Sequence, residues 1–388
     1  MDYEFSPEQD ALRQAIFDTC APFDDQYWMH KDIEGGFPHD FYQAIAKGGW
    51  LGIAIPEQYG GAGLGITEAT IMMQAIAETG GAMSAASAVH MNIFGLNPVI
   101  VYGNEEQKQR ALPPLIRGEA QACFGVTEPN TGLNTTQLTT RAERQGDRYI
   151  VNGRKVWIST AQVASHILLL ARTTPLDQVK KPTQGLSLFY TKLDRKYVDV
   201  REIKKMGRTS VDSNELFIDG FPIPVEDRIG EEGRGFEYIL HGMNPERILC
   251  AGEVIGIGFA ALRRATAYAK ERVVFNRPIG MNQGIQHPLA INWAELQAAQ
   301  LMTYRAAQLY DNGKPCGSEA NAAKYLGAEA SIKACETAIL THGGFGYAKE
   351  YHVERYLREA MILRIAPISP HLILCNIAEK VLGLPKSY

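Results

Sequence analysis

The residue types that most often carry chemistry are spread thinly along this chain of 388 residues. The six cysteines lie far apart and form no C-x-x-C pair; they are Cys20, Cys123, Cys250, Cys316, Cys335 and Cys375. No pair among the nine histidines has metal-ligand spacing with a third ligand nearby in the sequence. Metal sites and disulfide frameworks both depend on close spacing, so the sequence predicts free thiols and no metal site.

A glycine-rich run at Gly60–Gly65 could be read as a phosphate-binding loop. The run does not fit G-x-G-x-x-G in any register, and it opens no strand–turn–helix unit. We therefore interpret it as a turn between helices. Gly256 and Gly258 lie inside a helical pattern, where close packing against another helix is the simpler interpretation.

Composition and charge describe an ordinary globular protein long enough for two or three domains. Hydrophobic residues make up 45% of the chain and charged residues 21%, which excludes a disordered composition. A net charge of −4 without a basic stripe argues against nucleic acid as a partner. The acidic, polar N-terminus resembles no signal peptide, and no apolar run reaches the roughly 18–20 residues of a membrane span. We expect a cytoplasmic protein.

The elements that must position any site follow the order helix, strand, helix. Up to about residue 118 the pattern is helical: Ser6 to Gln9 form a capping box with Pro7 in the first turn, and Thr67–Thr79 and Glu105–Arg117 are further helices. The sequence predicts a helical domain over residues 1–118.

Residues 119–230 have the character of a compact, mainly antiparallel β domain. Arg148–Ile158 contains two β-rich runs around Asn152-Gly153, which predicts a hairpin turn at that pair. Short strands are predicted at His166–Arg172, Gly185–Tyr190 and Glu215–Ile218.

The helical period returns for the rest of the chain, residues 231–388. Long helices are predicted over Phe236–Phe275, Gln283–Asn312 and Glu319–Leu340. Antiparallel helices of this length joined by short turns form a bundle.

Six segments, in this order and spacing, resemble the acyl-CoA dehydrogenase family over essentially the whole chain. They are Pro56–Gly63 (PEQYGGAG), Val126–Gly132 (VTEPNTG), Asn152–Ser159 (NGRKVWIS), Lys205–Arg208 (KMGR), Arg272–Gly280 (RVVFNRPIG) and His342–Tyr347 (HGGFGY). The resemblance implies a mainly α fold of three domains: an α bundle, an antiparallel β barrel and a second α bundle. It also implies a flavoprotein with FAD as its cofactor.

By this resemblance, two groups of residues hold the FAD. One group lies against the isoalloxazine ring and the phosphates: Phe124, Val126, Thr127, Gly132, Leu133, Asn134, Trp157 and Ser159. In the other group, Arg272 and Phe275 match positions that reach the FAD of a neighbouring subunit, which implies at least a dimer and by analogy a homotetramer. Gln283 or Gln286 could join them, and Gly343 and Gly344 are further FAD-binding positions. Leu133 and Leu340 replace polar residues that are common in the family. Because the Leu133 side chain cannot form hydrogen bonds, we expect backbone N–H groups to bind the phosphates there.

The catalytic base of most family members is a glutamate in an E-G-T segment, and this chain lacks it. Ala366–Pro370 stands in that place, and Pro367 has no N–H to hold a thioester carbonyl. In isovaleryl-CoA dehydrogenases the base is on an earlier helix, and Glu246 falls on that position. The resemblance places Asn244, Arg247, Met243 and His90 at the acyl-CoA.

The resemblance therefore implies α,β-dehydrogenation of an acyl-CoA in fatty acid β-oxidation, with electrons passed to an electron-transfer flavoprotein. A same-fold oxidase or monooxygenase using O₂ and a non-catalytic acyl-CoA-binding homologue stay as alternatives. Ser84–Met91 matches the segment where dicarboxylyl-specific members carry an arginine; it has none, which disfavours a substrate with an ω-carboxylate.

Overall fold

The computed structural model describes residues 4–387 and begins with a helical region that agrees with the sequence analysis. Its helices are α1 (Pro7–Cys20), α2 (Asp25–Glu34), α3 (His39–Lys47), η1 (Trp50–Gly52), η2 (Glu57–Tyr59), α4 (Ile66–Ile76), η3 (Ala77–Gly81), α5 (Ala82–Phe94), α6 (Asn97–Tyr102) and α7 (Glu105–Ile116). The predicted capping box is present, because the Gln9 N–H donates to Ser6 Oγ at 3.2 Å while Gln9 Oε1 accepts from the Ser6 N–H at 3.1 Å.

A single mixed sheet follows the first helices. Its strands are β1 (Ala122–Gly125), β2 (Arg141–Gln145), β3 (Arg148–Ser159), β4 (His166–Arg172), β5 (Leu186–Lys192), β6 (Val198–Glu202), β7 (Ser213–Pro224) and β8 (Arg228–Ile229), with short 3-10 turns η4 (Thr135–Gln137), η5 (Leu176–Gln178) and η6 (Val225–Asp227) between them. The order is β6-β7-β3-β2-β4-β5-β8, and β1 pairs with β4. Most neighbours are antiparallel, while β4 pairs in parallel with both β1 and β2.

The predicted hairpin turn at Asn152-Gly153 is wrong. β3 runs straight through this pair, and its pairing with β7 only shifts register there. The turn lies earlier, at Gly146 and Asp147, where Gln145 pairs with Arg148 and Gly146 has a φ of 64°. Gly153 is needed for a different reason: a Cβ there would lie 2.4 Å from Thr140 Oγ1.

The last part of the chain is a helical bundle. It contains α8 (Gly235–His241), α9 (Met243–Glu271), the hairpin β9 (Val273–Val274) and β10 (Arg277–Pro278), η7 (Ile279–Met281), α10 (Gln283–Asp311), α11 (Gly317–His342), η8 (Gly343–Tyr347), η9 (Lys349–Tyr351), α12 (Val353–Ile365) and α13 (Pro370–Lys380). The single helix predicted over Phe236–Phe275 is wrong in detail, because it is broken at Gly242 and ends at Glu271.

The glycines singled out in the sequence serve close packing and turns. A Cβ on Gly256 would lie 2.4 Å from the carbonyl oxygen of Gln74 on α4, and one on Gly258 would lie 2.5 Å from Leu296 on α10. The run Gly60–Gly65 links η2 to α4, as expected for a turn between helical elements.

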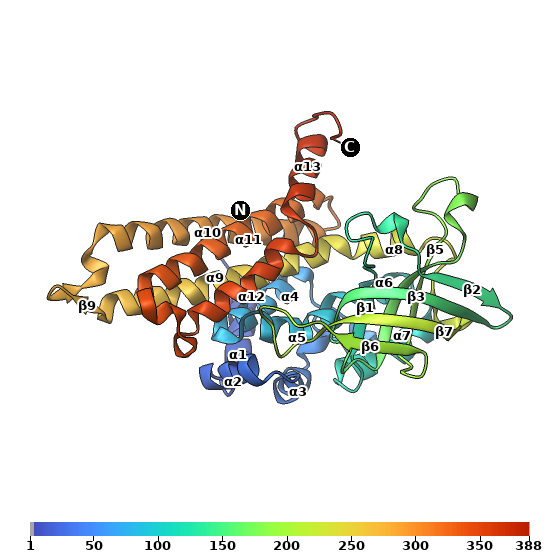
Figure 1. The fold of residues 1–388 in the computed structure, drawn as a ribbon, viewed down its shortest axis with the longest axis horizontal. Helices are drawn as coiled ribbons and strands as arrows, with labels where there is room; N and C mark the ends of the chain where they lie inside the picture. The colour runs from blue at the N-terminus through green and yellow to red at the C-terminus, as the bar shows by residue number, and fades with distance from the viewer. Residues whose placement is uncertain (1–3, 388) are drawn as a thin grey trace.

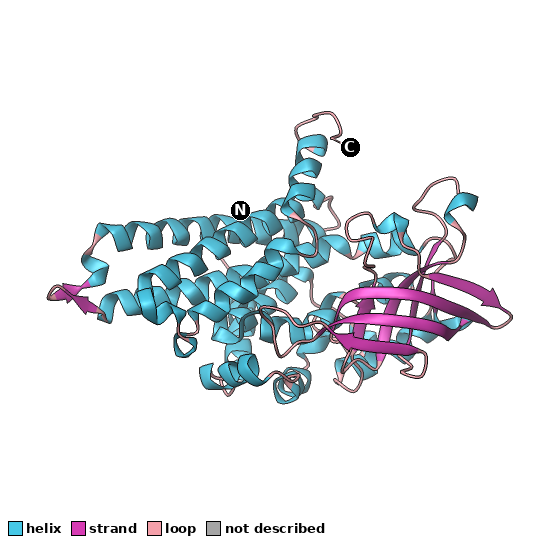
Figure 2. Cartoon of the chain, in the orientation of Figure 1, coloured by secondary structure: helices cyan, strands magenta, loops and turns pink. Residues whose placement is uncertain are grey.

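The three regions lie side by side along the long axis of the molecule (Figure 1). The bundle of α9–α12 occupies one side, the sheet occupies the other, and α4 and α5 lie between them, with α13 projecting away from the body. Figure 2 shows the large sheet at one end of the molecule with helices beside it, and the short β9–β10 hairpin at the opposite end. The helical stretch 66–102 is long and apolar enough to cross a membrane, but 76% of its apolar window is buried inside the structure, as in a core helix.

Candidate active site

Glu246 lies in the first turn of α9, where this helix passes between α5 and α11. Its side chain is partly buried and does not stand free in solvent. Burial raises the pKa of Glu246 to about 7, although the charges of His90 and Arg247 act to lower it. A carboxyl group that is half ionised near neutral pH is suited to accept a proton.

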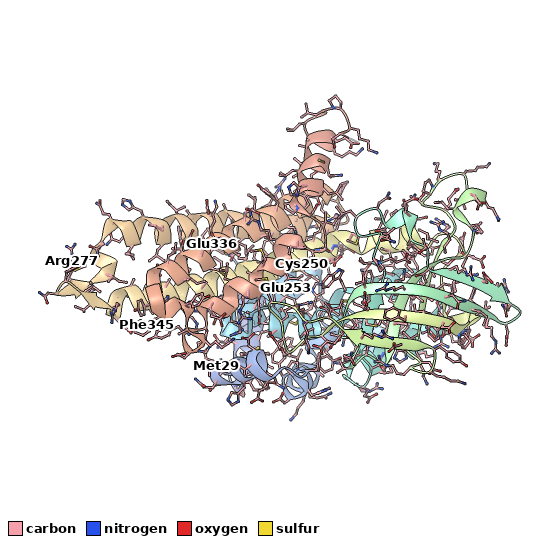
Figure 3. All side chains as sticks on the ribbon, in the orientation of Figure 1. Met29, Cys250, Glu253, Arg277, Glu336 and Phe345 are labelled. Carbon is pink, nitrogen blue, oxygen red and sulfur yellow. The ribbon has the colours of Figure 1, made fainter. Side chains whose placement is uncertain are left out.

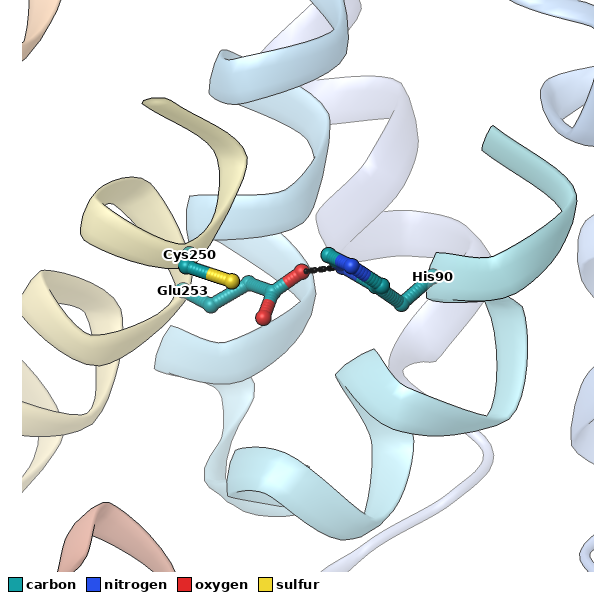
Figure 4. Close-up of side chains that lie close together, drawn as sticks. All are labelled: His90, Cys250 and Glu253. Atoms are coloured by element: carbon teal, nitrogen blue, oxygen red, sulfur yellow. Dashed lines mark hydrogen bonds and ion pairs between the residues drawn. The ribbon is translucent and has the colours of Figure 1, made fainter. Parts of the chain in front are cut away.

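The side chain of His90 on α5 faces the same part of α9. Its Nδ1 lies 2.6 Å from Oε1 of Glu253, which is fully buried (Figure 4). The Cys250 thiol completes a cluster whose potential metal-ligand atoms all lie within 4.8 Å of one another. Burial and the charges of Glu253 and Glu246 raise the pKa of Cys250 well above its ordinary value, so the sulfur stays a neutral thiol. We interpret the cluster as an ion pair beside a thiol.

Arg208 connects this helical cluster to the sheet. It lies between β6 and β7, and its guanidinium donates to Ser87 Oγ on α5 at 3.0 Å and to Ser159 Oγ on β3 at 3.3 Å. Arg208 is buried, and a third bond goes to Ser213 Oγ at 3.1 Å. Ser87 belongs to the segment Ser84–Met91, which has no arginine of its own. A cation that is bonded to three serine hydroxyls therefore contacts this segment from elsewhere in the chain.

The loop after β1, which carries the V-T-E-P residues, is held in place by a buried ion pair. Lys155 Nζ on β3 donates to Glu128 Oε1 and to the carbonyl oxygen of Val126, both at 3.0 Å. Burial acts to raise the pKa of Glu128, but Lys155 and the backbone N–H groups of Thr139 and Thr140 hold it down at about 2. The carboxylate is therefore ionised and fixes the loop.

This fixed loop and β3 bring several predicted flavin residues together. The Val156 N–H donates to the carbonyl oxygen of Thr127 at 2.9 Å, which joins the loop to β3. Trp157 has a φ of 62°, and 59% of its side chain is exposed although its neighbours in β3 are buried. Trp157 and Ser159 lie on the same strand, and the loop with Thr127 is hydrogen-bonded to that strand. An exposed indole ring and hydroxyl groups in one region suit a planar heterocycle with polar edges, so the residues present are suited to a flavin. Phe124, on β1, is half-buried, and Val126, at the start of the loop, is buried.

The residues predicted at the phosphates lie further along the same loop. Gly132, Leu133 and Asn134 are exposed, and a Cβ on Gly132 would meet nothing within 4 Å. Thr131 Oγ1, directly before them, is buried and has no hydrogen-bond partner among residues 4–387. The loop therefore has room and an unused hydroxyl for a ligand.

The predicted acyl-CoA residues lie at the start of α9. Arg247 Nη1 donates to Asn244 Oδ1 at 3.1 Å, and Met243 packs against the core below the sheet region. Arg247 Nε is buried and has no hydrogen-bond partner within the described part of the chain. An unpaired guanidinium N–H next to Glu246 is available for a ligand.

The segment that replaces E-G-T lies between α12 and α13. Lys324 on α11 donates from Nζ to the carbonyl oxygen of Ile368 at 2.8 Å. Lys324 is buried, and its charge also acts to lower the pKa of Glu246. The Ala366–Ser369 loop is thus tied to α11 beside the candidate base.

The second predicted group of FAD residues lies far from the first within one chain. Arg272 lies at the base of the β9–β10 hairpin and its guanidinium stacks over Phe345, 5.7 Å from the ring centroid. The hairpin and Phe345 lie toward the end of the molecule opposite the sheet, whereas Cys250 and Glu253 lie near its middle (Figure 3). Phe275 is 95% exposed. Gln283, Gln286, Gly343 and Gly344 are exposed as well.

Sequence reasoning missed Glu253, Arg208 and Lys324 as members of this site. Each is a buried charged residue, and Glu253 stands within the apolar run Ile248–Ile257. A buried charge without a local partner is the signal that could have pointed to them.

Comparisons with known proteins agree with this architecture. Three family models match in order along the chain: the acyl-CoA dehydrogenase N-terminal domain at residues 6–119, the middle domain at 123–221 and the C-terminal domain at 233–367. An acyl-CoA dehydrogenase of Mycobacterium tuberculosis is 35% identical, covering 99% of this chain and 98% of the relative. A subunit of the caffeyl-CoA reductase–Etf complex of Acetobacterium woodii is 33% identical, covering 85% of this chain and 86% of the relative.

A solved structure of glutaryl-coenzyme A dehydrogenase in complex with glutaryl-CoA superposes with a TM-score of 0.94 at 30% identity, covering 100% of this chain and 98% of the other. The fold and the site thus define a flavin-dependent oxidoreductase. The chain belongs to the acyl-CoA dehydrogenase family, whose members bind FAD.

Proposed function

We propose that this protein converts an acyl-CoA thioester to the trans-2-enoyl-CoA, with Glu246 as the base. The Glu246 carboxylate takes the α-hydrogen as a proton, and the β-hydrogen leaves with two electrons as a hydride, so that a C=C bond forms between the two carbons. The observation that carries the proposal is the position of Glu246: partly buried, with a pKa of about 7, beside a loop that lacks the usual glutamate.

FAD supplies the hydride acceptor when bound. We propose that Phe124, Val126, Thr127, Trp157 and Ser159 hold its ring, while backbone N–H groups of Gly132, Leu133 and Asn134 meet its phosphates. The rigid Glu128–Lys155 pair supports this role, because donors fixed before the reaction need no reorganisation as charge develops. The bond from Arg208 to Ser159 fixes the orientation of that hydroxyl in the same way.

The thioester must be oriented and its carbonyl polarised, since an ordinary α-proton is too weak an acid for a carboxylate. Pro367 has no N–H for the carbonyl oxygen. We propose that the N–H of Ile368 serves instead, with its backbone held by the bond from Lys324. Arg247, Asn244 and Met243 are placed at the pantetheine of the CoA, and the unpaired Arg247 Nε supports that assignment.

A second copy of the chain completes the cofactor site in this proposal. Arg272, Phe275, Gln283, Gln286, Gly343 and Gly344 would contact the FAD of that copy. Their exposure, and the distance of the β9–β10 hairpin from the sheet in Figure 1, support a contact between subunits. Sedimentation of the Arg272→Ala variant and its FAD content test this point: loss of FAD from an intact oligomer is expected, and full retention of FAD would contradict it.

We place the enzyme in the cytoplasm, in fatty acid breakdown, as a homotetramer with domains at residues 1–118, 119–230 and 231–388. Its electron acceptor is proposed to be an electron-transfer flavoprotein, which the named Etf complex of the relative from Acetobacterium woodii supports. Stopped-flow reoxidation distinguishes this acceptor from O₂: rapid reoxidation in air without the flavoprotein would contradict it.

Anaerobic mixing with a panel of straight, branched, aryl and dicarboxylyl acyl-CoAs tests the reaction itself. The protein is expected to be bleached by at least one member, and Glu246→Gln should slow that bleaching by about 10²–10⁴-fold. Glu336→Gln, an exposed glutamate on α11, is the matched control and should bleach at the normal rate. Full bleaching of the Glu246→Gln variant would remove Glu246 from its role.

A further inference from the structure

The sequence resemblance places His90 at the acyl-CoA, whereas the structure pairs its imidazole with the buried Glu253, which has no assigned role in the reaction. We propose that this pair holds a positive charge next to Glu246 and so keeps the Glu246 carboxyl ionised and ready for the α-proton. His90 and Glu253 are then positioning residues that act through Glu246. The effect of the pair on the Glu246 carboxyl does not depend on the proposed function; only its importance for catalysis rests on that proposal.

The helix geometry puts the two glutamates on one face of α9. Glu253 follows Glu246 by seven residues, which is close to two full turns of an α-helix. His90 approaches this face from α5, with Nδ1 2.6 Å from Glu253 Oε1. The contact joins residues 163 positions apart in the sequence, so the packing of α5 on α9 creates it.

The buried carboxyl group of Glu253 contacts the imidazole of His90 directly. Glu253 is fully buried, and its second oxygen, Oε2, has no hydrogen-bond partner among the described residues. An acidic side chain in direct contact with the imidazole stabilises the protonated form of His90. Burial acts to lower the pKa of His90. The charge and hydrogen bond of Glu253 raise it by more than burial lowers it, so the pKa of His90 lies above its ordinary value.

Several charged side chains act on His90 and on Glu246. His90 is faced by Glu253 and Glu246 from α9 and by Arg208 from the segment before β7. Glu246 is also faced by two other cations, Arg247 on α9 and Lys324 on α11. Among these charges His90 has the largest effect on Glu246; it lowers the pKa of that carboxyl and outweighs the opposite effect of Glu253. The packing of α5 on α9 thus places the imidazole of His90 at the face shared by the two glutamates, where its charge favours the ionised form of Glu246.

A purely structural ion pair would behave differently from a charge that tunes the base. If the pair only joined α5 to α9, its loss would reduce stability without changing the titration of Glu246. If the pair instead acts on Glu246 through its charge, the pKa of Glu246 must change according to which charges remain after each substitution. Replacing His90 alone leaves Glu253 as an unpaired anion, whereas replacing both leaves no charge at either position.

The test is an infrared pH titration of the holoenzyme, in which the Glu246 carboxyl band is identified by subtracting the spectrum of Glu246→Gln. His90→Gln should move the titration of Glu246 upward by roughly one pH unit or more. Glu253→Gln and the double variant should move it upward by less, and His90→Lys should return it toward the original value. His166→Gln, a histidine on β4 in the sheet, is the control and should leave the titration unchanged.

The titrations of these variants distinguish a purely structural ion pair from one that acts on Glu246 through its charge. An unchanged or downward titration in folded, FAD-containing His90→Gln overturns the inference, and equal shifts in all variants do the same. If His90→Gln does not fold, the double variant gives the comparison, because it buries no unpaired carboxylate. Bleaching by the Glu246→Gln variant reports separately on the proposed function: if that variant bleaches normally, the base assignment fails while the titration result still stands.

Discussion

Lys155 Nζ lies 3.0 Å from Glu128 Oε1, and this buried ion pair joins β3 to the loop that carries the candidate flavin contacts. Both side chains are almost completely shielded from solvent, with exposed fractions of 0% and 4%. The pair also receives support from the backbone, since the N–H groups of Thr139 and Thr140 donate to the same carboxylate. Lys155 is therefore the side chain that balances the buried charge of Glu128 and holds this loop against β3.

Replacing that lysine should destabilise the protein strongly. Lys155→Met leaves Glu128 as a buried, unpaired charge, which costs about 3–5 kcal/mol of the free energy of unfolding. The exposed pair of Lys204 and Glu202 provides the control, and Lys204→Met should cost no more than about 1 kcal/mol. Chemical denaturation with FAD content followed in parallel measures both, and equal costs for the two variants would contradict the structural role of the buried pair.

The pKa of Glu246 predicts how flavin reduction depends on pH. The base must be ionised to accept a proton, so the rate constant should rise with pH through about 7 and reach a plateau above it. Anaerobic stopped-flow experiments from pH 5.5 to 9 with a saturating acyl-CoA measure this profile. A rate constant that stays flat across the range, or that falls as pH rises through 7, would be inconsistent with a carboxylate base of this pKa.

Arg247 should contribute to CoA binding. Arg247→Met removes the guanidinium with its unpaired Nε, and KM for the acyl-CoA should rise about tenfold or more. The measurement belongs at pH 9, because Arg247 also lowers the pKa of Glu246 and the base must be ionised in both proteins. Acyl N-acetylcysteamine thioesters, which lack the nucleotide of CoA, should be affected much less.

Arg263→Met, on the exposed side of the same helix, is the matched control for Arg247→Met. It should leave KM for the acyl-CoA unchanged. An equal loss with the acyl-CoA and the truncated thioester would show that Arg247 acts on the base or the fold and not on the CoA.

Close packing of α9 on α4 predicts a cost for any side chain at Gly256. In Gly256→Ala the new Cβ would lie 2.4 Å from the Gln74 carbonyl oxygen and 3.0 Å from Ala77 Cβ, which should cost about 1–3 kcal/mol. Gly284→Ala on α10 meets nothing within 4 Å and should instead stabilise the protein by up to about 1 kcal/mol. Thermal unfolding of the two variants gives opposite shifts if the packing is as described.

Features fixed by local sequence could be predicted. The capping box at Ser6 depends on residues three apart, and the strand His166–Arg172 depends on a short apolar run with polar ends; the structure has both. The hairpin predicted at Asn152-Gly153 failed because that position is packed against a residue 13 positions away, Thr140, which directly precedes the neighbouring strand β2. Turn propensity alone could not reveal that contact.

The candidate site also contains residues that belong to local motifs and residues whose partners lie far away in the sequence. Glu246 and the loop around Thr127 belong to contiguous motifs, so the sequence resemblance was enough to propose them as site residues. Glu253 has its partner His90 on another helix, and Arg208 has partners on α5 and β3. These charges come together only through packing, and nothing in the sequence around each residue indicates which partner it meets.

Exchange of the α-hydrogen with solvent tests the central role of Glu246 most directly. A 3-thia-acyl-CoA, in which sulfur replaces the β-carbon, has no β-hydride to lose, so deuterium uptake at its α-carbon in D₂O reports proton removal alone. The unaltered enzyme and Glu336→Gln should incorporate deuterium rapidly, and Glu246→Gln should be slower by about 10²–10⁴-fold. Deuterium uptake by Glu246→Gln at the rate of the unaltered enzyme would show that another group removes the proton.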